Sequence, residues 1–388
     1  MLKTIQFIKE HPLLWDTLLT EDPYNLKIKR DEAFPHLISL SYDMINSDFS
    51  EPIVKEARGI IIDIEDIYNP VVVCQAFNKF WNWGENFATE IDWSTARVQE
   101  KVDGSLVKLW YYNKIDKWIL SSNSCIQASK AELVSGYNLE KLFLMAIRKY
   151  DCKSIEEFVD RFHLNPFYTY IFELVSPYNQ VVIQYSEPDI YFIGARQLAK
   201  IKDVMFINRE VDLSNDYFLR DIKQPKSYSL STLEDCIEAA KALNTDGKVE
   251  NEGFVVVDAN WNRVKIKSPD YVAMHHLANG LSREDLLHII RIGEVKEVLN
   301  YFPKYEMIIK EIARDYGSYQ RNLILRNFAA RKRWKELNQD RKAFAIEYSK
   351  KNFPEVFKLL DMDWKWNEYL KGLTDKQLLK NIDRYKAN

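Results

Sequence analysis

The sequence has few cysteines, and their spacing argues against both a zinc-stabilised domain and a disulfide-stabilised domain. The four cysteines are spread along 388 residues, as Cys74, Cys125, Cys152 and Cys236. No two of them form a CxxC pair, so neither a structural zinc site nor a disulfide framework is indicated. This usage is typical of a reducing compartment, and we expect a cytoplasmic protein.

Long apolar runs are also missing. No run reaches the roughly 18 residues that a membrane span needs, and the start of the chain carries His11, Pro12 and charges where a signal peptide needs an apolar core. Glycine and proline are scarce, at 11 and 12, whereas phenylalanine, tyrosine and tryptophan number 20, 22 and 10. These counts exclude low-complexity and disordered classes and predict a globular protein with no membrane segment.

Between about residues 50 and 270, short β-rich runs alternate with turns and short helical segments. The predicted strands, each rich in β-branched or aromatic residues, are 59–64, 71–77, 106–112, 168–175, 181–185, 190–194, 254–257 and 263–267. Apolar spacing of three to four residues predicts helices at 129–149 and 231–243. Most neighbouring strands lack the helix that a parallel crossover needs, so the pattern predicts an α+β fold with antiparallel sheets.

After residue 270 the pattern becomes helical, and the charge changes sign. Between Pro303 and Pro354 there is no proline and one glycine, Gly317, where a helix break is expected. Residues 271–388 carry 23 basic and 16 acidic side chains, so the net charge of −3 combines +7 here with −10 in residues 1–270. We predict two domains, 1–270 and 271–388, of which the second is small, all-α and basic.

The clearest local pattern is Lys101-Val102-Asp103-Gly104-Ser105, directly before a predicted strand. A partly buried lysine at a strand edge, beside a glycine that allows close approach, can act as a nitrogen nucleophile. The same letters also describe an ordinary Asp-Gly turn with a solvated lysine. The segment alone therefore leaves both readings open.

Four further segments place charged groups in or beside predicted strands. They are Glu56-Ala57-Arg58-Gly59, Asn78-Lys79-Phe80, Phe172-Glu173-Leu174-Val175, and Glu252-Gly253-Phe254 with its continuation Val264-Lys265-Ile266-Lys267. By two-residue alternation Lys265 and Lys267 share one face of their strand, and such a pair repels unless an anion lies between them. If each feature is considered alone, the two lysines can be explained by an edge strand with a charged, solvent-facing side. Glu173 can likewise be explained as a buried carboxylate that a structural arginine neutralises. Together, the cations suit a nucleotide triphosphate, and the carboxylates suit a divalent metal and a ribose.

In this order KVDGS, FELV, EGFVVV and VKIK resemble motifs I, III, IV and V of the covalent nucleotidyltransferases, which include RNA ligases, DNA ligases and mRNA-capping guanylyltransferases. Within that superfamily the chain resembles the ATP-dependent RNA ligases of the bacteriophage T4 RNA ligase 1 family. The likeness extends through EARGIIIDIE, FNKFWNWGE, SPYNQVVIQYSEPDIYFIGAR and KIKSPDYVAMHH, and it covers roughly residues 40–276. It implies an antiparallel-sheet, ATP-grasp-like ligase domain for residues 1–270.

The resemblance also implies a role for each matching residue. Lys101 is the nucleophile that takes AMP from ATP, and Glu252 is the residue associated with Mg²⁺ or Mn²⁺. The nucleotide-binding residues implied by the family are Tyr42, Arg58, Lys79, Gly104, Asn123, Glu173, Lys265 and Lys267. Asn123 departs from the family, because a Lys or Arg is expected there. An amide supplies no charge, so this departure predicts weaker nucleotide binding or slower adenylate transfer.

The family joins RNA ends that carry a 5′-phosphate and a 3′-hydroxyl, through lysyl-AMP and AppRNA intermediates. The implied biological role is RNA repair, with a tRNA cut in its anticodon loop as one substrate. The helical residues after His276 resemble in architecture the C-terminal domain of these ligases, in place of the β-barrel that follows motif V in DNA ligases and capping enzymes. There Arg331, Lys332, Arg333 and Lys335 are candidate contacts for RNA phosphates, although an exposed amphipathic face explains them equally well.

Two alternatives to an RNA ligase remain open from the sequence. One is a capping-type guanylyltransferase or a DNA ligase, which GTP preference or sealing of nicked duplex DNA would indicate. The other is a non-catalytic RNA-binding relative, against which the intact Lys101, Glu173, Glu252, Lys265 and Lys267 argue. The sequence predicts no oligomeric state.

Overall fold

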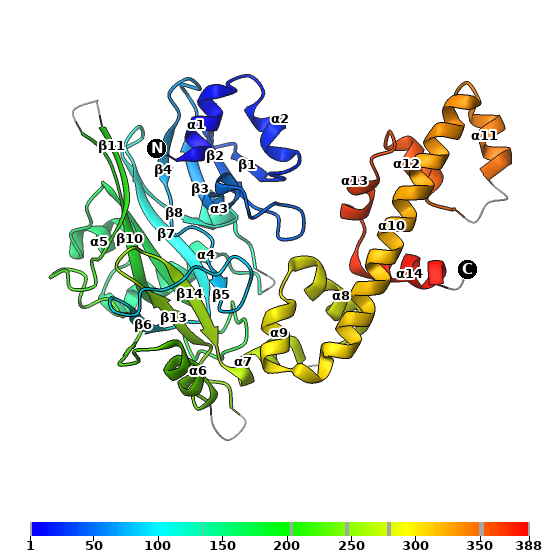
Figure 1. The fold of residues 1–388 in the computed structure, drawn as a ribbon. Coiled ribbons are helices and arrows are strands. Elements are labelled where there is room, and N and C mark those ends of the chain that lie inside the picture. The colour runs from blue at the N-terminus through cyan, green and yellow to red at the C-terminus, as the bar shows by residue number, and fades with distance from the viewer. Residues whose placement is uncertain are drawn as a thin grey trace. The chain divides into compact units, whose positions relative to one another are not determined.

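A computed structural model describes residues 2–133, 135–201, 205–244, 248–277, 281–348 and 353–386. The chain divides into two compact units, Met1–His275 and His276–Asn388 (Figure 1). The division falls within helix α7 (Pro269–Leu277), and the boundary predicted at residue 270 lies at the start of this helix.

The first unit contains three sheets, of which the first has four antiparallel strands in the order β1-β2-β3-β4. These strands are Lys27–Asp31, Phe34–Ser41, Arg58–Asp63 and Val71–Cys74. Helices α1 (Lys3–Glu10), α2 (Trp15–Thr20) and α3 (Pro52–Glu56) contribute to one core with this sheet. Side chains alternate along β3: Ile60 and Ile62 join that helical core, whereas Ile61 packs with Trp110 of the second sheet.

The second sheet has five antiparallel strands in the order β11-β10-β9-β7-β8. They are Met205–Val211, Asp189–Ile201, Tyr168–Val175, Ser105–Tyr112 and Lys117–Ser122. Helices α4 (Leu139–Ala146) and α5 (Ile155–Arg161) pack on one face, where the rings of Phe143 and Phe158 lie 5.8 and 6.1 Å from the ring of Phe172 on β9. Because side chains alternate, Glu173 points to the opposite face of this sheet.

The third sheet has five strands in the order β12-β6-β13-β14-β5, and only β5 pairs in a parallel direction, with β14. They are Ser227–Tyr228, Arg97–Glu100, Gly253–Val257, Arg263–Lys267 and Trp81–Asn82. Helix α6 (Leu233–Lys241) covers the face that carries Phe254 and Ile266, which leaves Val255 and Lys265 on the other face. The predicted α+β fold with antiparallel sheets is confirmed.

Two predicted elements of the first unit are wrong. Residues 181–185 form no strand, because the backbone N–H groups of Val182 and Ile183 donate to the carboxylate of Asp103 (2.9 and 2.8 Å) rather than to a neighbouring strand. The helix predicted at 129–149 is shorter, since α4 begins after Asn138, whose side chain accepts a hydrogen bond from the N–H of Lys141.

The second unit is helical throughout its described elements. After the α7 segment these are α8 (Arg283–Ile292), α9 (Val295–Tyr301), α10 (Glu306–Glu336), α11 (Arg341–Tyr348), α12 (Val356–Asp361), α13 (Trp366–Lys371) and α14 (Asp375–Lys386). The predicted break at Gly317 is wrong, because α10 runs through it with Ile312, Tyr319 and Leu323 in the core. A single glycine costs a helix only about 1 kcal/mol relative to alanine, which these contacts exceed. Among the described residues, no helix is both long enough and apolar enough to cross a bilayer.

Candidate active site

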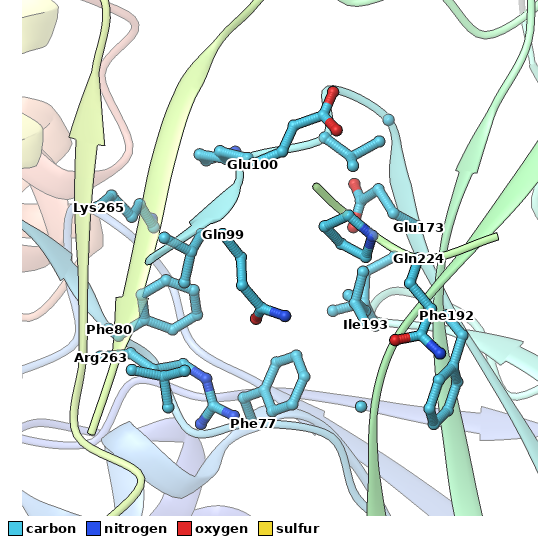
Figure 2. A pocket seen from close by; sticks show the side chains of 18 of the residues that line it. Phe77, Phe80, Gln99, Glu100, Glu173, Phe192, Ile193, Gln224, Arg263 and Lys265 are labelled. Atoms are coloured by element: carbon cyan, nitrogen blue, oxygen red, sulfur yellow. The ribbon is translucent and has the colours of Figure 1, made fainter. Parts of the chain in front are cut away.

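A cavity of about 500 Å³ lies between the second and third sheets of the first unit. Figure 2 shows Lys265, Phe80 and Arg263 across this cavity from Glu173, Ile193 and Phe192, with the side chain of Gln99 projecting between them. Other residues that line the cavity include Arg58, Lys101, Gly104, Leu106, Asn123 and Val255. Cations, carboxylates and aromatic rings thus line the same cavity.

Lys101 lies in the loop between β6 and β7 and lines the cavity. Its backbone N–H donates to the carbonyl of Gly253 (2.8 Å), and its Nζ lies 2.6 Å from Oε2 of Glu252. The two residues meet because β6 and β13 are antiparallel neighbours, with Glu100 opposite Phe254. The Lys101 side chain is 21% exposed and that of Glu252 4%, so the lysine can be reached from the cavity while its partner is enclosed.

Asp103 and Gly104 fix the loop that carries Lys101. The buried Asp103 accepts a hydrogen bond from the hydroxyl of Tyr271 (2.8 Å) in addition to the two from Val182 and Ile183. A Cβ added at Gly104 would lie 2.5 Å from the carbonyl oxygen of Leu174 on β9, so only glycine allows this approach. Asp103 therefore anchors the loop to residues 182–183 and to Tyr271 of α7, whereas Gly104, which also lines the cavity, packs against the second sheet.

Glu173 projects into the cavity from β9, opposite Leu106 of β7. Loss of hydration on burial raises the pKa of Glu173 to about 7, while Lys101 acts to lower this pKa and the nearby Glu252 to raise it. Burial also raises the pKa of Glu252, against the opposing influence of Lys101 and Lys267. The two carboxyls thus belong to one electrostatic cluster around Lys101.

Lys265 lines the cavity from β14 and lies among other cations. Burial lowers its pKa well below the usual value, and Lys79, Lys101 and Arg58 lower it further. Its Nζ lies 5.0 Å from the centre of the Phe80 ring, which offers only weak compensation. Lys267, on the same face of β14, acts on Glu252 and is not among the lining residues that the structure describes.

Arg58 and Asn123 form one corner of the cavity wall. Nη1 of Arg58 and Oδ1 of Asn123 are buried and have no hydrogen-bond partner among the described residues. Between them Gly59 has φ +71°, and a Cβ added there would lie 2.5 Å from Cα of Asn123. Unpaired buried polar atoms are costly, so this corner is suited to a polar ligand or water.

Tyr42 and Lys79 do not line this cavity within the described part of the chain. Nζ of Lys79 lies 5.3, 5.6 and 5.9 Å from the ring centres of Tyr42, Phe49 and Trp81. It also lies 3.6 Å from Sδ of Met44. The predicted nucleotide contacts of Tyr42 and Lys79 therefore stay predictions.

Sequence reasoning missed Gln99 and Arg263, which line the cavity beside Lys265. Strand pairing would have indicated both, because Gln99 and Lys265 flank Val255 in register and Arg263 is two residues before Lys265. Arg263 also shares Glu210 with Arg196, at 2.6 and 2.9 Å, in a network whose three side chains are each less than a tenth exposed. These partners lie far apart in sequence, so no local pattern could reveal the network.

The predicted RNA contacts lie at the end of α10. Arg331, Lys332 and Lys335 are exposed, whereas Arg333 pairs with Glu336 and Glu347 at 3.1 and 2.8 Å. Three of the four candidate residues therefore present their charge to solvent.

Two viral proteins with RNA ligase in their names are similar to this chain in sequence. One relative is a protein of Autographa californica nuclear polyhedrosis virus that is named a bifunctional polynucleotide kinase/RNA ligase. Its sequence is 29% identical to this chain over 306 residues, which cover 74% of this chain and 40% of that protein. An RNA ligase of Rhodothermus phage RM378 is 25% identical over 285 residues, covering 62% of this chain and 64% of that one. The chain therefore spans less than two thirds of the length of either relative.

A solved structure of an archaeal ATP-dependent RNA ligase matches 80% of this chain and 77% of its own, with 15% identity and a TM-score of 0.43. The sequence profile of the RNA ligase family matches residues 56–271, more than half of the chain and the whole of the loop and strands that form the cavity. The chain belongs to the RNA ligase family.

Proposed function

We propose that this protein is an ATP-dependent RNA ligase that joins a 5′-phosphate end to a 3′-hydroxyl end. The observation that carries the proposal is Lys101, which faces the cavity while its Nζ lies 2.6 Å from the enclosed carboxylate of Glu252. A lysine in that position can serve as the nitrogen nucleophile of covalent nucleotidyl transfer.

In the first step Nζ of Lys101 attacks the α-phosphorus of ATP. A P–N bond forms, the bond from the α-phosphorus to the bridging oxygen breaks, and diphosphate leaves. The amine must release a proton, and Oε2 of Glu252 at 2.6 Å is within reach to accept it. Lys265 and Arg58, on the walls of the same cavity, neutralise phosphate charge.

Two further phosphoryl transfers follow in the proposal. The 5′-phosphate of the RNA displaces the lysine to give AppRNA, and the 3′-hydroxyl of the other end then displaces AMP to form a phosphodiester. Each step exchanges one bond to phosphorus for another, so the same cations can serve all three by alignment and charge neutralisation.

Glu252 fits a role as a ligand of Mg²⁺ or Mn²⁺, and Glu173, in the same electrostatic cluster around Lys101, fits the nucleotide contact expected of it. Mg²⁺ commonly binds through one or two carboxylates together with substrate phosphates. When bound, the ion would neutralise charge on the transferred phosphate.

We further propose RNA with closely placed ends, such as a nicked tRNA, as the substrate. The exposed Arg331, Lys332 and Lys335 of α10 supply positive charge for RNA phosphates. The Asn123 amide provides no charge in the cavity wall, and we expect nucleotide binding there to depend more strongly on Arg58 and Lys265.

The first test is covalent labelling of the full-length protein with α-³²P-ATP and Mg²⁺. Wild-type protein should retain label on a denaturing gel, and Lys101→Ala should lose it entirely. Lys130→Ala is a matched control, because Lys130 is paired with Asp31 at 2.7 Å and does not line the cavity. Undiminished labelling of Lys101→Ala would contradict the proposal.

Assays with several substrates distinguish an RNA ligase from a capping-type enzyme, a DNA ligase and a non-catalytic RNA-binding relative. Circularisation of a 5′-phosphorylated single-stranded RNA is expected with ATP. Stronger labelling by GTP would indicate a capping-type enzyme, and preferential sealing of nicked duplex DNA would indicate a DNA ligase. Absence of label with either nucleotide would leave an RNA-binding relative.

A further inference from the structure

Lys108 is a fully buried lysine that the proposed reaction does not use. It lies on β7, and its exposed fraction is 0%. Its Nζ donates a hydrogen bond to the carbonyl oxygen of Gly59, and no carboxylate pairs with it among the described residues. Burial of an amine without a carboxylate is costly, so the presence of a lysine at this position calls for a physical reason.

The strand alternation relates Lys108 to the cavity. Lys108 lies two residues beyond Leu106, so the two side chains leave the same face of β7, the face that also carries Glu173 on the neighbouring strand. Leu106 and Glu173 line the cavity. Lys108 therefore continues that face beneath the first sheet, where it reaches β3 at Gly59.

Gly59 lies between Arg58 and Asn123 in the corner of the cavity wall that these two residues form. Its φ of +71° and its contact with the backbone of Asn123 leave no space for a side chain. Arg58 precedes it, with its guanidinium 5.3 Å from the centre of the Phe80 ring, and both Arg58 and Asn123 line the cavity. A displacement of the Gly59 carbonyl would thus move two lining residues together.

Those two residues present polar atoms that need to be held in place. Nη1 of Arg58 and Oδ1 of Asn123 are buried and unpaired among the described residues. Groups that bind developing or transferred charge are effective when the surrounding structure fixes them beforehand. Burial lowers the pKa of Lys108, the nearby thiol of Cys74 acts to raise this pKa, and Arg58 acts to lower it, which agrees with the closeness of the two cations.

We propose that Lys108 is a positioning residue, which holds the Gly59 carbonyl and thereby fixes Arg58 and Asn123 for contact with a phosphate of the bound nucleotide. The phosphate contact rests on the proposed function, whereas the holding of the Gly59 corner does not. Lys108 touches neither the nucleotide nor Lys101 in this role.

The experiment compares full-length Lys108→Met with wild type and with Val107→Ala. Val107 is the adjacent residue, is fully buried, and packs into the core on the opposite face of β7, so its variant controls for lost stability without touching Gly59. The rate of lysyl-AMP formation is measured against ATP concentration. We expect KM for ATP to rise about tenfold in Lys108→Met, since a small misplacement of a binding group can cost up to 10²-fold. In Val107→Ala, KM should stay within about twofold of wild type.

A double variant tests whether Lys108 acts through Arg58. If it does, Lys108→Met combined with Arg58→Met should raise KM no further than Arg58→Met alone, because both changes remove the same contact. Multiplied losses, or a folded Lys108→Met protein with wild-type KM, would overturn the proposal. If Lys108→Met does not fold, Lys108→Leu, which also lacks an N–H donor, takes its place under the same criteria.

Hydrogen exchange gives a readout that does not depend on catalysis. Amides of a peptide covering residues 56–62 should exchange faster in Lys108→Met than in wild type or Val107→Ala. Unchanged exchange would refute the holding of the Gly59 corner even if the enzyme is active. Failure of wild-type protein to accept label from ATP would instead reject the proposed function and leave the exchange result to decide the role of Lys108.

Discussion

At the scale of single residues, Glu173 has a carboxyl group whose protonation changes near neutral pH. The pKa of this group is raised to about 7 by burial, against an ordinary value of 4.5. Between these two pH values the folded protein binds more protons than the unfolded chain does. Stability contributed by the protonated Glu173 is therefore complete below about pH 4.5 and is lost as pH rises through about 7.

This dependence predicts the behaviour of Glu173→Gln, which cannot ionise. Its melting temperature should exceed that of wild type by about 5 °C at pH 8, and the difference should shrink towards pH 5. Thermal unfolding followed across this range measures it. The exposed Glu90→Gln is the control, and its difference from wild type should not change with pH. A constant difference for Glu173→Gln as well would rule out the raised pKa as the cause.

The candidate site could be predicted from the sequence only in part. The order of the motifs indicated Lys101, Glu173, Glu252 and Lys265, which the folded chain brings to one cluster. Asp103 was visible only as part of a turn, because its role depends on Tyr271, 168 residues away. Lys79 shows the opposite problem, since its rotamer places it in an aromatic cluster that no sequence pattern could specify.

At the scale of elements, the corner formed by β3 and the segment after β8 depends on the absence of one side chain. Gly59→Ala would combine a left-handed backbone, about 1–2 kcal/mol, with a steric overlap of about 1–3 kcal/mol. We expect a loss of about 2–5 kcal/mol in the free energy of unfolding, measured by denaturant titration.

Gly136→Ala separates the two contributions to this loss. Gly136 has φ +79° but nothing within 4 Å of an added Cβ, so only the backbone cost applies. Its loss should be about 1–2 kcal/mol. Equal losses at the two positions would show that the contact with Asn123 relaxes without cost.

Strands could be predicted from the sequence where their backbone hydrogen bonds are made to neighbouring strands. β9, β13 and β14 were anticipated almost to the residue, because β-branched and aromatic side chains predominate in β9 and β13, and Val264 and Ile266 alternate with charged residues in β14. Residues 181–185 have a similar composition but donate to Asp103, and a side-chain acceptor from another part of the chain cannot be read from local propensity.

At the scale of the whole molecule, the two units have separate apolar cores and opposite charge. The helical unit has a core of its own, to which Ile312, Phe344 and Leu378 contribute. Residues 271–388 carry a net charge of +7, and those before them −10. This division predicts that RNA affinity depends on the helical unit, whereas lysyl-AMP formation depends on the first unit.

Charge reversal on α10 tests this division. The triple variant Arg331→Glu, Lys332→Glu and Lys335→Glu should weaken binding of a fluorescent single-stranded RNA, and it should reduce the slope of log K against log salt by about 2, because three phosphate contacts are lost. Labelling of Lys101 by ATP should not change. Fluorescence anisotropy at several salt concentrations measures the effect.

The control reverses three exposed lysines elsewhere in the same unit, Lys358, Lys376 and Lys380. Both variants change the net charge by the same amount. Equal effects on RNA binding would mean that overall charge, rather than the end of α10, attracts the RNA.

The crowding of Lys265 by Lys79, Lys101 and Arg58 has a practical consequence for the choice of buffer. Any multivalent anion that binds these cations in the folded state stabilises the protein by mass action, whether or not it is a substrate. Phosphate and sulfate buffers should therefore protect the protein during purification and storage while they compete with ATP for the same cations. Preparations made in such buffers will show higher melting temperatures and lower initial rates than the same protein in a monovalent salt.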